Sequence, residues 1–155
     1  MNIGVVVYSR SGNTLSVAEK LKERLSAAGH SVKLEQVAVA GGGKPGERRL
    51  ELGTLPDLAG YDGVVFGAAV EAFSLSSVMS AYLKKVGSLE GKKVAFLVTE
   101  GFPYPWMGGN RAVSQMKKLC RAKGAEIVGS AVVNWAKSRR EKTTAAALDR
   151  LTGLF

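Results

Sequence analysis

Short apolar runs that alternate with amphipathic stretches constrain the fold of this chain more than any other feature. The runs are rich in Val and Ile and have few polar interruptions, which is typical of strands buried on both faces of a parallel sheet. Turn residues such as Gly29 and Gly124 separate the amphipathic stretches from the runs that follow them. The pattern predicts strands at 2–8, 31–39, 63–67, 94–98 and 126–133.

Each amphipathic stretch carries apolar residues at helical spacing. The first has Leu15, Ala18, Leu21 and Leu25 along one face. Helices are expected at 14–28, 74–86, 110–123 and 138–151. Strands that alternate with helices form a parallel sheet with right-handed crossovers and helices on both faces. We therefore expect an α/β three-layer sandwich, with a five-stranded parallel sheet of order 2-1-3-4-5 in a single domain over residues 1–155.

Three loops of this sheet are the candidate functional segments. In such sheets, ligands bind beyond the carboxyl ends of the strands, near the point where the strand order reverses. The loops that follow Tyr8, Gly67 and Val98 meet at that edge.

The first loop places three hydroxyl side chains and a glycine between a buried strand and the start of a helix. Helix N-termini present unpaired N–H groups, and hydroxyls add donors, so a phosphate is well matched here. Helix capping is the alternative explanation for the same residues. Dinucleotide and triphosphate loops do not fit, because Gly12 stands alone and Gly43-Lys44 is followed by Pro45. The candidate phosphate-binding residues are Ser9, Arg10, Ser11, Gly12, Asn13 and Thr14.

This loop resembles a known family motif. Its Ser9-x-Ser11-Gly12-x-Thr14 pattern is similar to the Thr/Ser-x-Thr/Ser-Gly-x-Thr loop with which flavodoxins hold the phosphate of FMN. Residues 61–67 and 91–99 resemble the third and fourth strands of that family, and the resemblance covers residues 2–151. It implies a flavodoxin-like fold, noncovalent FMN binding and a function in electron transfer.

By the same resemblance, the second loop, residues 68–74, lies beside the flavin ring. The Ser-Pro and the Tyr or Gly of many family members are missing from it, so no glycine is available for a peptide flip next to the flavin. Phe73 either stacks on the ring or packs the following helix against the core. Glu71 either bonds a ring N–H or is a solvated charge. The candidate ring-binding residues here are Ala69, Val70, Glu71 and Phe73.

The third loop, residues 99–109, holds three aromatic residues and two prolines. The resemblance implies that the rings stack on the flavin while backbone groups of Thr99, Glu100 and Gly101 bond its pyrimidine edge. A local apolar cluster or a subunit interface is the alternative, because exposed aromatic patches also mark interfaces. The remaining candidate residues of this loop are Phe102, Tyr104, Trp106 and Gly108.

The charge of the chain is unevenly distributed. There are 22 Lys+Arg against 13 Asp+Glu, a formal net charge of +9, and residues 78–155 carry the whole excess. Carriers of the flavodoxin family are typically acidic, so the basic surface indicates an acidic redox partner or an anionic substrate. The basic helices lack interleaved aromatic residues, which argues against nucleic-acid binding.

Two other functions stay open beside electron transfer. One is a small FMN-dependent oxidoreductase in which NAD(P)H reduces a quinone-like acceptor, with residues 40–60 and the third loop available to build a substrate pocket. The other is a binding module of the same fold without flavin, suggested by the altered second loop.

The single cysteine excludes a disulfide framework and fits a reducing compartment, so a cytoplasmic location is expected. No apolar run reaches the ~20 residues that a membrane span requires. Cys120 is expected in the core, because it shares the inward face of its helix with Val113 and Met116. His30 is expected in a surface turn, since no cluster of metal-ligating residues surrounds it in the sequence.

Overall fold

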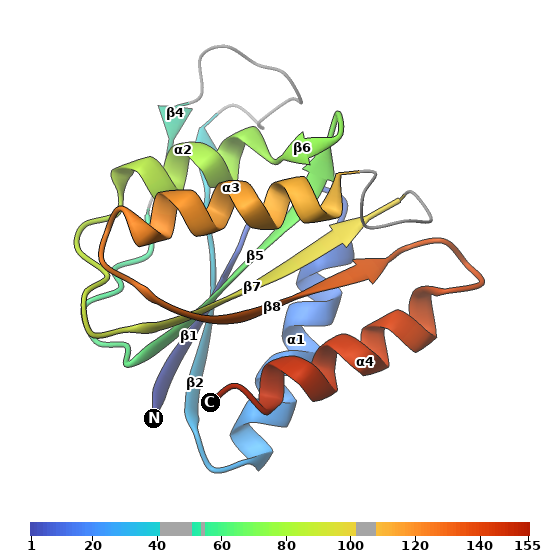
Figure 1. Cartoon of the computed structure of the whole chain (residues 1–155), viewed down its shortest axis with the longest axis horizontal. Coiled ribbons are helices and arrows are strands. Elements are labelled where there is room, and N and C mark those ends of the chain that lie inside the picture. Colours follow the sequence, from blue (N-terminus) through green and yellow to red (C-terminus); the bar gives the residue numbers. More distant parts are fainter. Residues whose placement is uncertain (41–50, 54, 102–107) are drawn as a thin grey trace.

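A computed structural model describes residues 1–40, 51–53, 55–101 and 108–155 of the chain. Its centre is a parallel sheet in which the main strands lie in the order β2-β1-β5-β7-β8 (Figure 1). These strands are β1 (Asn2–Val7), β2 (Ser31–Gln36), β5 (Gly63–Glu71), β7 (Lys93–Glu100) and β8 (Glu126–Asn134). The predicted α/β sandwich and its strand order 2-1-3-4-5 are therefore confirmed.

Helices cover both faces of the sheet (Figure 1). One face carries α1 (Asn13–Ala27) and α4 (Arg140–Thr152), which pack against each other. The opposite face carries α2 (Ser77–Lys85) and α3 (Gly109–Arg121), which are also in contact. Each expected helix is present, with its bounds shifted by a few residues. Two hydrophobic cores result, one on each side of the sheet.

The strands supply alternate side chains to these two cores. In β1, Val5 belongs to the core under α1 and α4, whereas Val6 belongs to the core under α2 and α3. Residues of the interior strand β1 are wholly buried from Ile3 to Val7, which explains the nearly continuous apolar run in the sequence. The register pairs Val5 with Leu34 on one side and with Val65 on the other.

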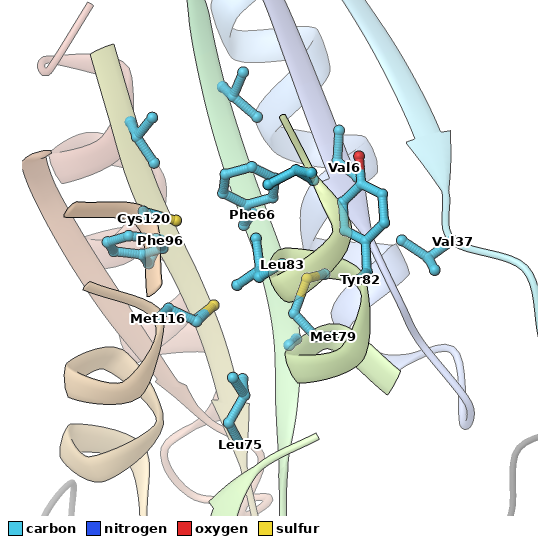
Figure 2. Packing of buried hydrophobic residues seen from close by; sticks show 14 of the residues in the cluster. Val6, Val37, Phe66, Leu75, Met79, Tyr82, Leu83, Phe96, Met116 and Cys120 are labelled. Atoms are coloured by element: carbon cyan, nitrogen blue, oxygen red, sulfur yellow. The ribbon is translucent and has the colours of Figure 1, made fainter. Parts of the chain in front are cut away.

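Aromatic and aliphatic side chains together fill the core under α2 and α3, as Figure 2 shows. The ring of Phe66 stacks against Phe96 with centroids 6.5 Å apart, and Tyr82 meets the edge of Phe66 at 6.3 Å. Cys120 lies in the same core, and burial raises the pKa of its thiol to about 12. The prediction of a core thiol is confirmed, since Cys120 is buried in this cluster.

Several predicted boundaries are wrong. The third strand continues past Gly67 to Glu71, and β6 (Ser74–Leu75) folds back to pair with it in antiparallel fashion. Ser74 and Leu75 therefore belong to a strand, although helical spacing placed them in α2. The second predicted strand ends at Gln36, and β3 (Val39–Ala40) pairs instead with β4 (Glu51–Leu52).

No helix among the described residues is both long and apolar enough to cross a membrane. The same residues contain no group of three or more His, Cys, Asp or Glu side chains arranged for a metal ion. His30 lies in the turn after α1, where its Nδ1 is 3.3 Å from the amino group of Met1.

Candidate functional site

The carboxyl ends of β1, β5 and β7 lie at one edge of the sheet (Figure 1). After β1, the backbone N–H of Tyr8 donates to the carbonyl of Gly67 at 3.1 Å, which holds the first loop beside the third strand. The chain then turns at Gly12, whose φ of 87° lies in the left-handed region that favours glycine. This conformation starts α1 immediately, because the carbonyl of Gly12 accepts the N–H of Ser16 at 3.0 Å.

The N-terminus of α1 lacks a side-chain cap from any described residue. Its first turn also contains no acidic residue that would neutralise the positive end of the helix dipole. The first N–H groups of a helix have no partner within the helix and attract anions. The alternative explanation, in which the polar residues of this loop serve as helix caps, is therefore not supported by the geometry of α1.

The hydroxyl of Ser9 is a second polar feature of the first loop. Its hydroxyl oxygen is buried and has no hydrogen-bond partner among the described residues. An unsatisfied buried hydroxyl is costly, so such groups call for an explanation. Arg10 and Ser11, the next two residues, are exposed, while Asn13 is half-buried at the start of the helix.

Thr14 lies differently from the rest of the first loop. Its side chain is buried, and its hydroxyl is 2.7 Å from the hydroxyl of Thr99 near the end of β7. This bond joins the first and third candidate loops across the intervening strand β5. The backbone N–H of Thr14 belongs to the first turn of α1 and has no partner within the helix, which suits an anion.

The second candidate segment is a β-hairpin and not an open loop. Ala69, Val70 and Glu71 are the last residues of β5, and a two-residue turn then leads into β6. Both turn residues, Ala72 and Phe73, have left-handed backbones, with φ of 49° and 62°. Turns of this kind normally use Asn-Gly, because other residues pay ~1–2 kcal/mol each for the conformation. Such strained turns concentrate at functional sites.

Phe73 is 50% exposed at the tip of this hairpin. It therefore does not pack α2 against the core, which was one of the two roles open for it. Its backbone instead approaches Gly108, where an added Cβ would lie 3.1 Å from the Cα of Phe73.

A depression of about 430 Å³ separates the first loop from the hairpin. This volume falls in the range of small-molecule sites, roughly 300–1,000 Å³. The structure thus brings together two of the three segments that the sequence singled out. The described residues that line the depression are Tyr8, Arg10, Ser11, Ala69, Val70 and Glu71.

The third segment begins inside the sheet, since Thr99 and Glu100 are the last residues of β7. Gly101 follows and is exposed. Gly108 packs against the hairpin with a φ of 127°, and an added Cβ there would lie 2.6 Å from Cγ1 of Val70. The aromatic residues Phe102, Tyr104 and Trp106 lie outside the described residues.

The side chain of Glu100 is a feature that the sequence did not indicate, because only its backbone was expected to bind the flavin. The carboxylate is 3% exposed, and its Oε2 accepts the N–H of Gly109 at 3.0 Å. The other oxygen, Oε1, is buried and has no partner among the described residues. Burial raises the pKa of the Glu100 carboxyl, and the hydrogen bond from Gly109 partly opposes that shift.

This environment predicts a pH-dependent stability. Because the folded chain holds the Glu100 proton more tightly than the unfolded chain, the stabilisation is complete below the usual pKa of 4.5. It is lost as the pH rises through the folded-state pKa. Glu100→Gln stays neutral and keeps an oxygen that can accept the N–H of Gly109. We expect the variant to be the more stable protein at a pH of about 8, and the difference to shrink towards a pH of about 4.

Urea unfolding followed by circular dichroism across this pH range measures the effect. Parallel pH profiles for Glu100→Gln and the parent chain would contradict it. Glu90→Gln, at a carboxylate on the exposed surface, serves as the control.

The geometry is similar to that of solved flavodoxins. Flavodoxin 2 from Bacillus cereus has a TM-score of 0.71 and 24% identity, and the match covers 99% of this chain and 97% of that protein. The flavodoxin of Streptococcus pneumoniae TIGR4 has a TM-score of 0.72 and 17% identity, with coverages of 99% and 96%. A flavoprotein in complex with FMN from Lactobacillus acidophilus NCFM has a TM-score of 0.63 and 17% identity, with coverages of 94% and 97%. No protein-family model matches the chain. The flavodoxin-like fold is thereby confirmed.

Proposed function

We propose that the chain binds FMN noncovalently and acts in electron transfer. The observation that carries this proposal is the uncapped N-terminus of α1, with the unsatisfied hydroxyl of Ser9 beside it. A phosphate placed there would accept hydrogen bonds from the Ser9 hydroxyl and from backbone N–H groups of the first loop. The similar structure from L. acidophilus, which is in complex with FMN, supports the same choice of ligand.

The flat ring of FMN would extend from the phosphate site into the depression next to the hairpin. Val70 offers an apolar surface there, and Phe73 lies half-exposed at the tip of the hairpin, where an aromatic ring could contact the flavin. Glu71 is half-buried at the edge of the depression, within the segment that would bond polar groups of the ring. When bound, the flavin supplies the redox chemistry, while these residues bind and orient it.

The residues assigned to the cofactor form three groups. The phosphate group comprises Ser9, Arg10, Ser11, Gly12, Asn13 and Thr14. The hairpin group comprises Ala69, Val70, Glu71 and Phe73, and the third group comprises Thr99, Glu100, Gly101, Phe102, Tyr104, Trp106 and Gly108. Sequence alone supports the assignment of Phe102, Tyr104 and Trp106.

The excess of basic side chains favours an acidic protein as the redox partner, because complementary charge speeds encounter between proteins. We also propose a cytoplasmic location, because a free cysteine such as Cys120 is typical of proteins in a reducing compartment.

Titration of the purified chain with FMN tests the cofactor assignment. Quenching of flavin fluorescence and a flavin absorption spectrum that stays with the protein through gel filtration are expected. A chain that remains colourless and does not quench FMN would rule out electron transfer through this cofactor.

A second measurement separates a carrier from an enzyme. NAD(P)H is added anaerobically to the FMN-loaded chain without any other protein. A carrier keeps its yellow colour, because it depends on a separate reductase. Rapid bleaching would instead identify the chain as a small NAD(P)H-dependent oxidoreductase.

A further inference from the structure

A groove of about 490 Å³ runs between α1 and α4, on the face of the sheet away from the hairpin. Its lining includes the buried apolar side chains of Val17 and Leu148, and Trp135 lines it as well. The described residues that line it include four cations, Lys20, Arg24, Lys137 and Arg140, and a single acid, Glu141. The proposed cofactor site uses none of these residues.

One of these cations is already neutralised. Arg24 forms an ion pair with Asp149 of α4 at 2.5 Å. Lys20, Lys137 and Arg140 therefore leave a net positive charge along the groove.

Contacts with Trp135 hold the positive charge of Arg140 in place. The guanidinium of Arg140 lies 4.5 Å from the centroid of the Trp135 ring. It also donates to the carbonyl of Trp135 through Nε at 3.2 Å and Nη2 at 2.9 Å. The N–H of Asn134 donates to the hydroxyl of Thr143, which fastens the start of α4 to the end of β8. A charge that is ordered in advance loses little entropy when it meets a partner.

The groove opens at the edge of the sheet that carries the proposed cofactor site. The N–H of Trp135 donates to the carbonyl of Glu100 at 2.7 Å, so the groove begins one strand away from the third candidate loop. Figure 1 shows the turn between β8 and α4 at the same end of the sheet as the ends of β5 and β7. A protein seated in this groove would have its surface close to that edge.

Another basic cluster lies at the opposite end of the molecule. Lys118 and Arg121 occupy the last turn of α3, and the carbonyl of Lys123 just beyond accepts the N–H of Leu89 in the loop before β7. This cluster flanks the amino ends of the strands. A partner bound there would be kept away from the proposed flavin.

We propose that the groove between α1 and α4 is the docking surface for an acidic protein, which inserts carboxylate side chains between Lys20, Lys137 and Arg140. Only one part of the proposal rests on the proposed function, namely that the docked acidic protein is the redox partner. Charge favours this occupant over a second copy of the chain, since two molecules of net charge +9 repel each other. Carboxylates suit the ordered guanidinium of Arg140, which retains N–H groups for a charge-assisted hydrogen bond.

The test uses the whole chain without FMN, labelled with 15N, and decaglutamate as an acidic peptide probe at low ionic strength. The backbone amides of residues 137–142 and the indole of Trp135 are expected to shift in a saturable manner, and the binding to weaken as salt is added. Lys20→Glu combined with Lys137→Glu should weaken binding by about tenfold or more. The matched control, Lys118→Glu combined with Arg121→Glu, makes the same change in net charge at exposed positions and should weaken it by about twofold.

Three results would overturn the proposal. The chemical shifts could centre on residues 117–123 or spread over all basic residues, or the two double variants could lose the same affinity for decaglutamate. Inorganic pyrophosphate could also bind more tightly than decaglutamate at the same amides. The last would identify a site for small phosphorylated anions. Because no flavin is present, the outcome does not depend on FMN binding. Binding of decaglutamate in the groove by a chain that never binds FMN would support the docking surface and contradict the proposed function.

Discussion

Ser11→Asp is expected to abolish FMN binding, with an affinity loss of about a hundredfold or more. Ser11 lies in the exposed part of the first loop and lines the depression next to the hairpin. A carboxylate at this position would face the phosphate of FMN, and two unit charges about 4 Å apart near a protein surface repel by about 4 kcal/mol. The loss is measured by fluorescence titration of FMN with the purified variant.

Ser11→Asn is the matched control, because Asn has the size of Asp but no charge. We expect it to bind FMN within about tenfold of the parent chain, since only one hydrogen bond changes. If Asp and Asn weaken FMN equally, steric crowding explains the loss. If neither weakens it, the phosphate does not bind at this loop.

Gly108→Ala is expected to destabilise the chain by about 2–4 kcal/mol. The backbone of Gly108 has a φ of 127°, which residues with a Cβ rarely adopt. The new methyl group would also lie 2.6 Å from Cγ1 of Val70 and press on the hairpin backbone at Phe73. Urea unfolding at neutral pH measures the loss, and FMN titration should show weaker binding because the hairpin has moved.

Gly87→Ala controls for the general effect of replacing glycine. No described atom lies within 4 Å of the position of its added Cβ, so little change in stability is expected. Combining Gly108→Ala with Val70→Ala removes the closest contact and should restore part of the stability lost by Gly108→Ala alone. Equal stability of the Gly108→Ala and Gly87→Ala variants would show that the hairpin and the start of α3 do not require this close approach.

The main strands and helices could be predicted because their signals are local. The run at Ile3–Val7 is apolar without alternation, and burial on both sides of the sheet is its direct physical cause. The extension of β5 to Glu71 could not be predicted in the same way. Its turn at Ala72 and Phe73 contains neither Asn nor Gly, so the sequence carries no sign of the hairpin.

The same distinction applies to the candidate site, where local signals could be predicted and contacts between separate elements could not. Residues of the first loop were predicted from a short pattern, because phosphate sites at helix N-termini use neighbouring residues. The role of the Glu100 side chain depends on its contact with Gly109 and on burial by separate elements, neither of which leaves a local pattern. The groove likewise joins Lys20 to Lys137, which only the packing of α1 against α4 brings together.

The packing of α1 against α4 also determines the order in which the chain can complete its structure during synthesis. Helix α1 leaves the ribosome early, yet Val17 and Leu21 share their core with Leu148 and Leu151 of α4. The part of α1 that contacts α4 therefore stays uncovered until α4 has been synthesised, although the strands of the sheet cover the rest of its apolar face earlier. Until then the nascent chain exposes apolar surface that chaperones can bind, and the core on this face of the sheet is complete only when α4 docks.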